Sequence, residues 1–168
     1  LERNVIKPMK AFELKIAASK PAKNEIWYTS IDGKVVQPYD ANAFGATIMS
    51  NIYEYGKGVI TFDDEVNVIG DDAFRLSSTL TSVIIPDGVT SIGKGPFNNC
   101  PNLKDFKGKF ASDDGRCLIA DGVLHSFAPA ELTEYTIDEN VITIGDDAFV
   151  NCDHLTNVTI PNSVKTIE

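Results

Sequence analysis

Two side chains capable of nucleophilic or acid–base chemistry flank one predicted turn. Cys117 precedes and His125 follows the dipeptide Asp121-Gly122, which favours a tight β-hairpin turn. A thiol beside an imidazole can form a thiolate–imidazolium pair. A nucleophile also needs a rigid, oriented pocket, and the tip of a hairpin offers little of one. Because the sequence also lacks a phosphate-binding loop, a dinucleotide fingerprint and a Ser-His-Asp spacing, we expect no enzymatic activity and no cofactor.

Paired carboxylates are the second group with possible chemistry. They stand at Asp63-Asp64, Asp71-Asp72, Asp113-Asp114 and Asp146-Asp147. Calcium prefers oxygen ligands, but the Asp-x-Asp-x-Asp-Gly pattern of a calcium loop is absent and Lys94 interrupts the series. Carboxylates also satisfy the first N–H groups of a helix and suit its dipole. We therefore expect two of these pairs, at 71–72 and 146–147, to cap helical turns, and we expect no bound metal.

These two pairs belong to a stretch that recurs along the chain. Val66-Asn-Val-Ile-Gly-Asp-Asp-Ala-Phe74 returns in similar form at 89–97 and 141–149, and a partial copy begins at Val164. Val66 and Val89 are 23 residues apart, as are Val141 and Val164. Each full copy is followed at fixed offsets by the pattern Leu-x-x-Val/Phe, which two copies extend with x-Ile. A fixed period in the twenties with this pattern is typical of a leucine-rich-repeat solenoid.

Each unit is expected to contain a strand, a turn and a short helix. The side chains of Val83 and Ile85 share one face of a strand, and Pro86 ends its pairing because proline has no N–H. Another set of residues shares one offset and consists of accepted helix N-caps, namely Asp72, Gly95 and Asp147. The predicted fold is an α/β leucine-rich-repeat solenoid, a right-handed superhelix rich in strands with short helical turns. Its internal column should contain Ile69, Ile92 and Ile144, with Phe97 and Phe149 inside.

The second and third full copies are separated by a degenerate unit. Val89 and Val141 are 52 residues apart, which is two periods and six residues. Residues 110–130 contain two Asp-Gly turn signals, so we expect a β-hairpin insert that projects from the stack and exposes Cys117. Cys100 and Cys152 should lie two coils apart, about 10 Å, which is too far for a disulfide.

The N-terminal part of the chain divides into two predicted segments. Residues 1–24 form a leader or linker, residues 25–58 form a β-hairpin cap, and 59–168 form the solenoid with its insert. In the cap, Glu25–Ser30 should pair with Val35-Val36 across Asp32-Gly33. Residues 47–55 should turn back at Gly56 into 59–62, the expected first solenoid strand.

The charge distribution excludes one class of partner. Residues 1–24 hold six of the 15 Lys and Arg but only two of the 24 Asp and Glu, so the rest of the chain is strongly acidic. Nucleic-acid binding depends on neutralising phosphates with basic residues, so we expect no nucleic-acid partner. No run of 18 apolar residues occurs, so we expect no membrane-spanning segment.

Stacked strands present their outward side chains as one surface, and extended solenoid faces of this kind bind partners. The outward positions are the candidate binding residues, in pairs on four expected strands: Ser82 and Ile84, Asp105 and Lys107, Glu134 and Thr136, Asn157 and Thr159. A solvated sheet without a partner is an equal alternative.

Residues from about 60 to 168 resemble the BspA-like leucine-rich-repeat family. Its consensus unit reads Ile-Pro-x-x-Val-x-x-Ile-Gly-x-x-Ala-Phe-x-x-Cys-x-x-Leu-x-x-Val, and residues 137–158 match it nearly throughout. The resemblance implies an exported bacterial protein, secreted or at the cell surface, whose signal peptide is not in this chain. It also implies adhesion to a host or bacterial surface protein or glycan, and it supplies no catalytic residues. A structural spacer without a ligand is the alternative.

The last expected coil has no cap of its own. The sequence stops at Ile167-Glu168, inside a unit, so apolar positions and strand edges should be open there. We therefore expect either a trimmed chain or an end-to-end homodimer through the C-terminal coil.

Overall fold

The structure is a computed structural model that describes residues 20–168. The leader or linker predicted at 1–24 lies almost wholly outside the described residues. The described strands, in chain order, are β1 (Glu25–Ser30), β2 (Ile48–Glu54), β3 (Lys57–Phe62), β4 (Val68–Ile69), β5 (Leu80–Ile85), β6 (Ser91–Ile92), β7 (Asp105–Gly108), β8 (Cys117–Ala120), β9 (Val123–Phe127), β10 (Glu134–Thr136), β11 (Thr143–Ile144), β12 (Asn157–Thr159) and β13 (Thr166–Ile167).

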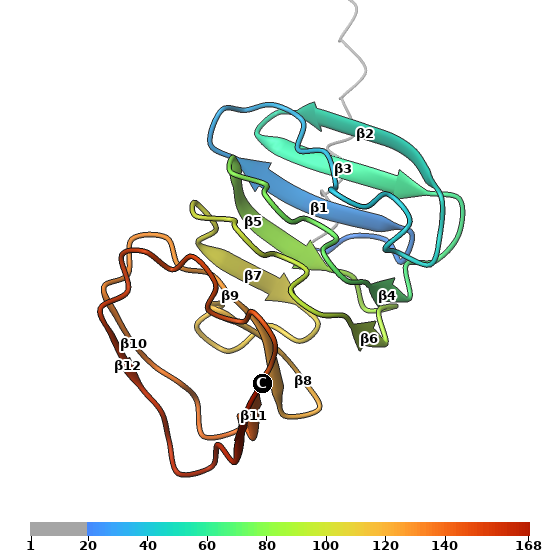
Figure 1. The fold of residues 1–168 in the computed structure, drawn as a ribbon. Coiled ribbons are helices and arrows are strands. Elements are labelled where there is room, and N and C mark those ends of the chain that lie inside the picture. Colours follow the sequence, from blue (N-terminus) through green and yellow to red (C-terminus); the bar gives the residue numbers. More distant parts are fainter. Residues whose placement is uncertain (1–19) are drawn as a thin grey trace, which may run out of the picture.

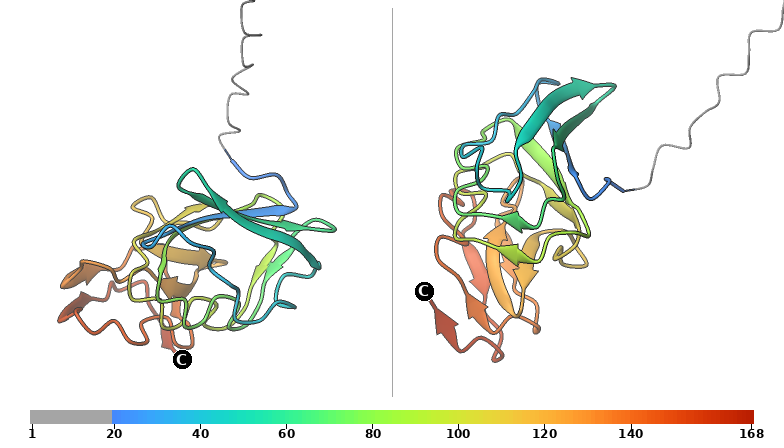
Figure 2. Two further views of the ribbon diagram at one scale, coloured as in Figure 1. Left: turned by 90° about the horizontal axis from the view of Figure 1, so that it is seen from above. Right: turned by 90° about the vertical axis from the view of Figure 1, so that its right-hand side faces the viewer.

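The repeats stack as coils of a β-solenoid (Figures 1 and 2), as the period predicted. Parallel pairs place each residue opposite its counterpart 23 residues later: β4 pairs with β6 through Ile69 and Ile92, and β11 pairs with β13 through Ile144 and Ile167. Strands β5 and β7 on the other side of the coil are paired with the same offset. The single column predicted through Ile69, Ile92 and Ile144 is thus found as two separate columns, because Ile144 pairs with Leu124 and Ile167 in another sheet.

No segment of residues 20–168 is helical, so the predicted helical turns are wrong. The three expected N-caps have positive φ angles, 54° for Asp72, 48° for Gly95 and 59° for Asp147. An α-helix needs negative φ, whereas aspartate and glycine are among the residues that best tolerate the left-handed region. The fixed offset therefore marks a left-handed turn, and the paired acids do not cap helices.

The N-terminal cap differs from the predicted hairpin. β1 lies between β3 and β5 and is antiparallel to both, in a five-stranded sheet of order β2-β3-β1-β5-β7. The prediction that Glu25–Ser30 pairs with Val35-Val36 is wrong. The expected first solenoid strand at 59–62 lies in β3, but it does not pair with β5 because β1 is inserted between them. The β2–β3 hairpin forms as expected.

One side chain explains why β1 and β3 fit together closely. The Tyr28 ring lies over Gly58, where an added Cβ would come within 2.1 Å of the ring. The Tyr28 hydroxyl donates a hydrogen bond to Asn51 Oδ1 at 2.7 Å and accepts one from the Val36 N–H at 3.1 Å. A buried hydroxyl with two partners fixes both β2 and the 31–39 loop against β1.

The insert does not project from the stack. β8 and β9 form the expected hairpin, but β9 also pairs in parallel with β11, so that Leu124 stands opposite Ile144. Strand β9, which belongs to the insert, thus takes the place beside β11 that a strand of a regular unit would occupy. Cys117 is fully buried, and the prediction that it is exposed is wrong.

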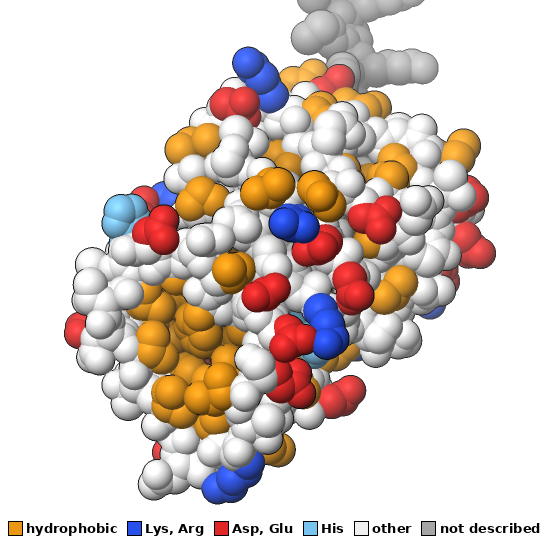
Figure 3. Space-filling view, in the orientation of Figure 1, with side chains coloured by type: hydrophobic (Ala, Val, Ile, Leu, Met, Phe, Trp, Pro, Cys, Tyr) orange, Lys and Arg blue, Asp and Glu red, His pale blue; other side chains and the backbone are white. Residues whose placement is uncertain are grey.

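The core consists of two clusters along the solenoid. In the first, five phenylalanine rings follow one another with centroids 5.0–5.6 Å apart: Phe62, Phe44, Phe74, Phe97 and Phe106. In the second, Phe149 is only half-buried and packs on Phe127 at 4.9 Å. The C-terminal coil exposes its column, since Ile167 is 64% exposed whereas Ile69 is fully buried. Figure 3 shows hydrophobic side chains gathered over this coil.

Candidate binding face

The outer face of the five-stranded sheet carries an apolar row that runs across four of its strands, β2, β3, β1 and β5. Directly opposite residues share a face, and the pairing continues from Ile52 to Val59, to Trp27 and to Ile84, and ends at Lys107. Ile52 is 51% exposed, and Val59 and Ile84 are partly exposed. The row therefore offers aliphatic surface at the middle of an otherwise polar face.

Trp27 is the largest residue of this row, yet it is mostly covered. The Lys57 ammonium lies 3.6 Å from the centre of its ring, and its indole N–H donates to Glu25 Oε2 at 2.8 Å. The cation over the ring occupies the flat surface on which a sugar would stack. Trp27 thus supports the face from below and positions Lys57 on it.

Polar side chains form a second row beside the first. Thr29 stands opposite Ser82, and Ser82 stands opposite Asp105, to which its hydroxyl donates a hydrogen bond. Lys107 lies 3.6 Å from the Asp105 carboxylate in an exposed ion pair. The partly exposed Thr29 hydroxyl and the Asp105–Lys107 pair thus form a polar rim next to the aliphatic row, whereas Ser82, predicted to point outward, is buried.

The structure divides the eight residues predicted from the sequence into two groups. Ser82, Ile84, Asp105 and Lys107 lie on β5 and β7, in register. The other four form a separate two-stranded sheet, β10 with β12: Glu134, Thr136, Asn157 and Thr159. In the described part of the chain β7 and β10 belong to different sheets, because the insert lies between their coils. One continuous strand face was predicted, and two are found.

Four further residues lie on the same face as the β5 and β7 group but were not predicted from the sequence. Ile52, Val59, Trp27 and Lys57 come from the cap, and they join the face only because β1 is inserted beside β5. The alternation of Glu25, Trp27 and Thr29 with buried Ile26 and Tyr28 was a local signal that these side chains face outward.

A hollow lies at one end of these strands, where the two sheets separate. It has a volume of about 720 Å³ and is lined by Ile31, Thr81, Pro101, Asn102, Lys104, Ala130, Glu131, Leu132, Thr133 and His154. An ion pair from Lys104 to Glu131, with 2.6 Å between nitrogen and oxygen, bridges its two sides. Both side chains are exposed, so the pair contributes little to stability.

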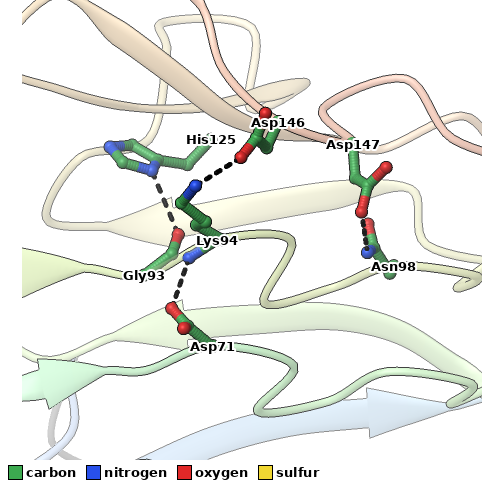
Figure 4. Close-up of polar contacts among 7 residues, drawn as sticks. All are labelled: Asp71, Gly93, Lys94, Asn98, His125, Asp146 and Asp147. Atoms are coloured by element: carbon green, nitrogen blue, oxygen red, sulfur yellow. Dashed lines mark hydrogen bonds and ion pairs between the residues drawn. The ribbon is translucent and has the colours of Figure 1, made fainter. Parts of the chain in front are cut away.

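The possible thiolate–imidazolium pair is not formed. The Cys117 thiol donates to the Tyr135 hydroxyl at 3.4 Å, and that hydroxyl donates to Asp114 Oδ2 at 3.0 Å. His125 instead bonds through Nδ1 to the Gly93 carbonyl at 3.1 Å (Figure 4). Burial raises the pKa of the Cys117 thiol to about 12 and lowers the pKa of His125. A protonated thiol and a neutral imidazole are the opposite of an activated nucleophile.

The acidic pairs hold successive coils together on the loop side (Figure 4). The Lys94 N–H donates to Asp71 Oδ1 at 2.7 Å, and the Lys94 ammonium donates to Asp146 Oδ2 at 2.6 Å. Asn98 Nδ2 donates to Asp147 Oδ2 at 3.1 Å. Lys94 therefore places a positive charge between two carboxylates of equivalent repeat position. Among the described residues no group of three or more His, Cys, Asp or Glu is arranged to hold a metal.

The three thiols are free, so Cys100 and Cys152 are not joined, in agreement with their predicted separation. Within residues 20–168 there is no helix long and apolar enough to cross a membrane. The end-to-end homodimer stays a prediction.

Three solved structures resemble the chain. A leucine-rich repeat protein from Eubacterium ventriosum is 25% identical over 52% of this chain and 25% of its own length, with a TM-score of 0.42. A leucine rich cell surface protein from Faecalibacterium prausnitzii is 30% identical over 60% of this chain and 31% of its own, with a TM-score of 0.38. A leucine-rich repeat protein from Bacteroides capillosus is 26% identical over 84% and 97%, with a TM-score of 0.32.

The chain thus spans about a quarter to a third of the length of the first two of these proteins. None of the curated proteins matches it. The family described as BspA type Leucine rich repeat region matches in six copies, at residues 45–112 and 124–168, and the gap between them falls in the insert. Since these matches cover more than half of the sequence and coincide with the observed coils, the chain belongs to the BspA-type leucine-rich-repeat family.

Proposed function

We propose that this chain is a non-catalytic recognition module that acts at the bacterial cell surface or outside the cell, and that it binds its ligand through the outer face of the five-stranded sheet. The observation that carries the proposal is the apolar row from Ile52 to Ile84 beside hydroxyls and charges. An aliphatic centre with a polar rim is the usual composition of a protein-binding surface.

The geometry favours a protein ligand over a glycan. Glycan recognition would use an open aromatic ring, and the one tryptophan of this face lies beneath Lys57. The exposed Ile52 and the partly exposed Ile84 offer surface to another protein's apolar residues, and Asp105 and Lys107 offer charges that set orientation. The Faecalibacterium prausnitzii protein, described as a cell surface protein, supports the proposed location.

The β10–β12 residues Glu134, Thr136, Asn157 and Thr159 belong to the proposal as a second contact area. They are exposed and lie in register on two strands. Because the insert separates them from the first face, a ligand that touched both would have to span the hollow between the sheets. We therefore assign them an auxiliary part in binding.

The test is binding to arrays of host matrix proteins, bacterial surface proteins and glycans. The variants Ile52→Asp and Ile84→Asp place a carboxylate in the apolar row. The control Ile142→Asp changes an isoleucine of another loop that is 53% exposed, close to the 51% of Ile52. We expect the first two to lose binding and the third to keep it, with all three folded by circular dichroism. Equal binding by all variants would show that another surface is used. Binding to no protein or glycan would favour the spacer alternative.

A further inference from the structure

Leu76 is an exception at a repeat position where two other coils have asparagine. It occupies the same repeat position as Asn99 and Asn151, and the three residues share a left-handed backbone conformation, with φ angles of 60°, 58° and 52°. Asparagine tolerates this region, whereas a leucine in it is uncommon because its Cβ crowds the following carbonyl. The first coil therefore keeps an unfavourable residue where the other two coils have a favourable one.

Packing does not explain this leucine. Leu76 is 56% exposed, so more than half of its surface remains in water. Its N–H donates to the Asn98 carbonyl at 2.8 Å, and an asparagine in the same conformation would keep that bond. A strained residue with an exposed apolar side chain is a signal of function, because neither strain nor exposure benefits the fold.

Leu76 faces a groove formed with the loop that follows β1. This Leu76 groove has a volume of about 430 Å³, and its lining includes Val35, Tyr39, Arg75 and Leu76. The exposed fractions are 37% for Val35 and 55% for Tyr39. The Tyr39 N–H donates to the Ala73 carbonyl at 2.9 Å, which fixes the loop against the coil. Three exposed apolar side chains thus line a shallow, open groove.

The groove presents one positively charged side chain in a chain that is acidic overall. Arg75 is the single charged residue in its lining, although the whole chain carries a net charge of −9. Its guanidinium lies 5.3 Å from the centre of the Tyr39 ring and 3.6 Å from Asp72, in an exposed contact. A carboxylate of a partner could pair with this arginine at the edge of the apolar patch.

We propose that the Leu76 groove docks a peptide segment of a partner protein that presents an aliphatic or aromatic side chain next to an acidic residue. The apolar side chain packs between Leu76, Val35 and Tyr39, and the carboxylate pairs with Arg75. The groove is separate from the outer sheet face, and the proposal does not depend on that face having a ligand.

The test uses a phage-displayed library of random peptides, panned on the immobilised protein and on the variant Leu76→Asn. We expect the wild type to enrich peptides that combine an apolar residue with Asp or Glu. We expect Leu76→Asn to weaken the binding of the enriched peptides by about tenfold or more. The same variant should raise the midpoint of thermal unfolding by about 2–4 °C, because it removes the strain of a left-handed leucine.

Two matched variants complete the test. Ile142→Asn removes an equally exposed apolar side chain elsewhere and should leave peptide binding unchanged. Arg75→Gln should weaken the binding of the acidic peptides while leaving the apolar contact in place. The proposal is overturned if no peptide is enriched, if Leu76→Asn binds the peptides as tightly as the wild type does, or if it unfolds at a lower temperature, since the leucine would then be there for packing.

Discussion

Phe97 is the central ring of the first core, and its truncation tests the stacked arrangement most directly. The ring is 4% exposed and lies parallel to Phe74, with an interplanar angle of 5° and 5.3 Å between centroids. It also meets Phe106 edge-on at 5.0 Å. Truncating a buried phenylalanine to alanine costs about 3–5 kcal/mol through lost burial and the cavity left behind. Because Phe97 packs on rings of two neighbouring coils, we expect Phe97→Ala to fall in the upper half of that range.

The matched variant is Phe149→Ala, at the equivalent position of a later coil. Phe149 is only half-buried, so we expect its truncation to cost about half as much. Urea unfolding followed by circular dichroism measures both. With a slope of about 2 kcal/mol/M, Phe97→Ala should lower the midpoint by about 2 M. If Phe149→Ala lowered it by as much, or if neither variant did, the rings would not be graded in burial as the structure requires.

Three other predictions concern the polar and thiol groups. Burial raises the pKa of Cys100 and Cys117 to about 12 and that of Cys152 to about 11. A thiol reagent at neutral pH should therefore modify half-buried Cys152 first and the other two only on unfolding. Mass spectrometry would detect this order of modification. Lys94→Glu would place three carboxylates in a row with Asp71 and Asp146, so its unfolding temperature should fall at low ionic strength and recover in high salt. Burial lowers the pKa of His125 below its ordinary value of 6.5, so folding favours the neutral ring and stability should fall as the pH drops below 6.5. His125→Asn, which can donate to the same Gly93 carbonyl, should flatten this part of the stability–pH curve.

The repeat made the coils predictable from sequence. Ile69 and Ile92 stand 23 residues apart and lie directly opposite each other, because coils of equal length stack with equivalent residues in register. The β2–β3 hairpin was predictable for a different reason, since Gly56 supplies the turn and the two strands are adjacent in the chain. In both cases the necessary information is local or periodic.

The position of β1 was not predictable in this way. Its alternation of Ile26 and Tyr28 with Trp27 and Thr29 defines two faces but does not say which strand it pairs with. That choice depends on Gly58, which leaves room for the Tyr28 ring, and on Asn51 and Val36, which satisfy its hydroxyl. The contribution of Trp27 to the candidate face depends on this pairing, so it could not be predicted from the sequence alone.

The left-handed turns were predicted to be helical because the residues at this offset suit both structures. Asp72 and Asp147 suit both a helix N-cap and a positive φ, and Gly95 at the same offset suits both as well. The discriminating signal lay four residues later, where Asn99 and Asn151 occupy a second left-handed position. Two such positions within one turn exclude a helix between them.

The two blocks of the solenoid belong to separate sheets, and strand β8 lies between their two core clusters. Along β8, Leu118 and Ala120 contribute to the first core cluster, whereas Cys117 and its neighbour Ile119 pack on the second. This is the alternation of a strand with a core on each of its faces, so β8 is a wall shared by both. The insert therefore interrupts the strand face that a regular solenoid would present, and at the same time it supplies the apolar surface that lets coils on either side of the interruption remain packed.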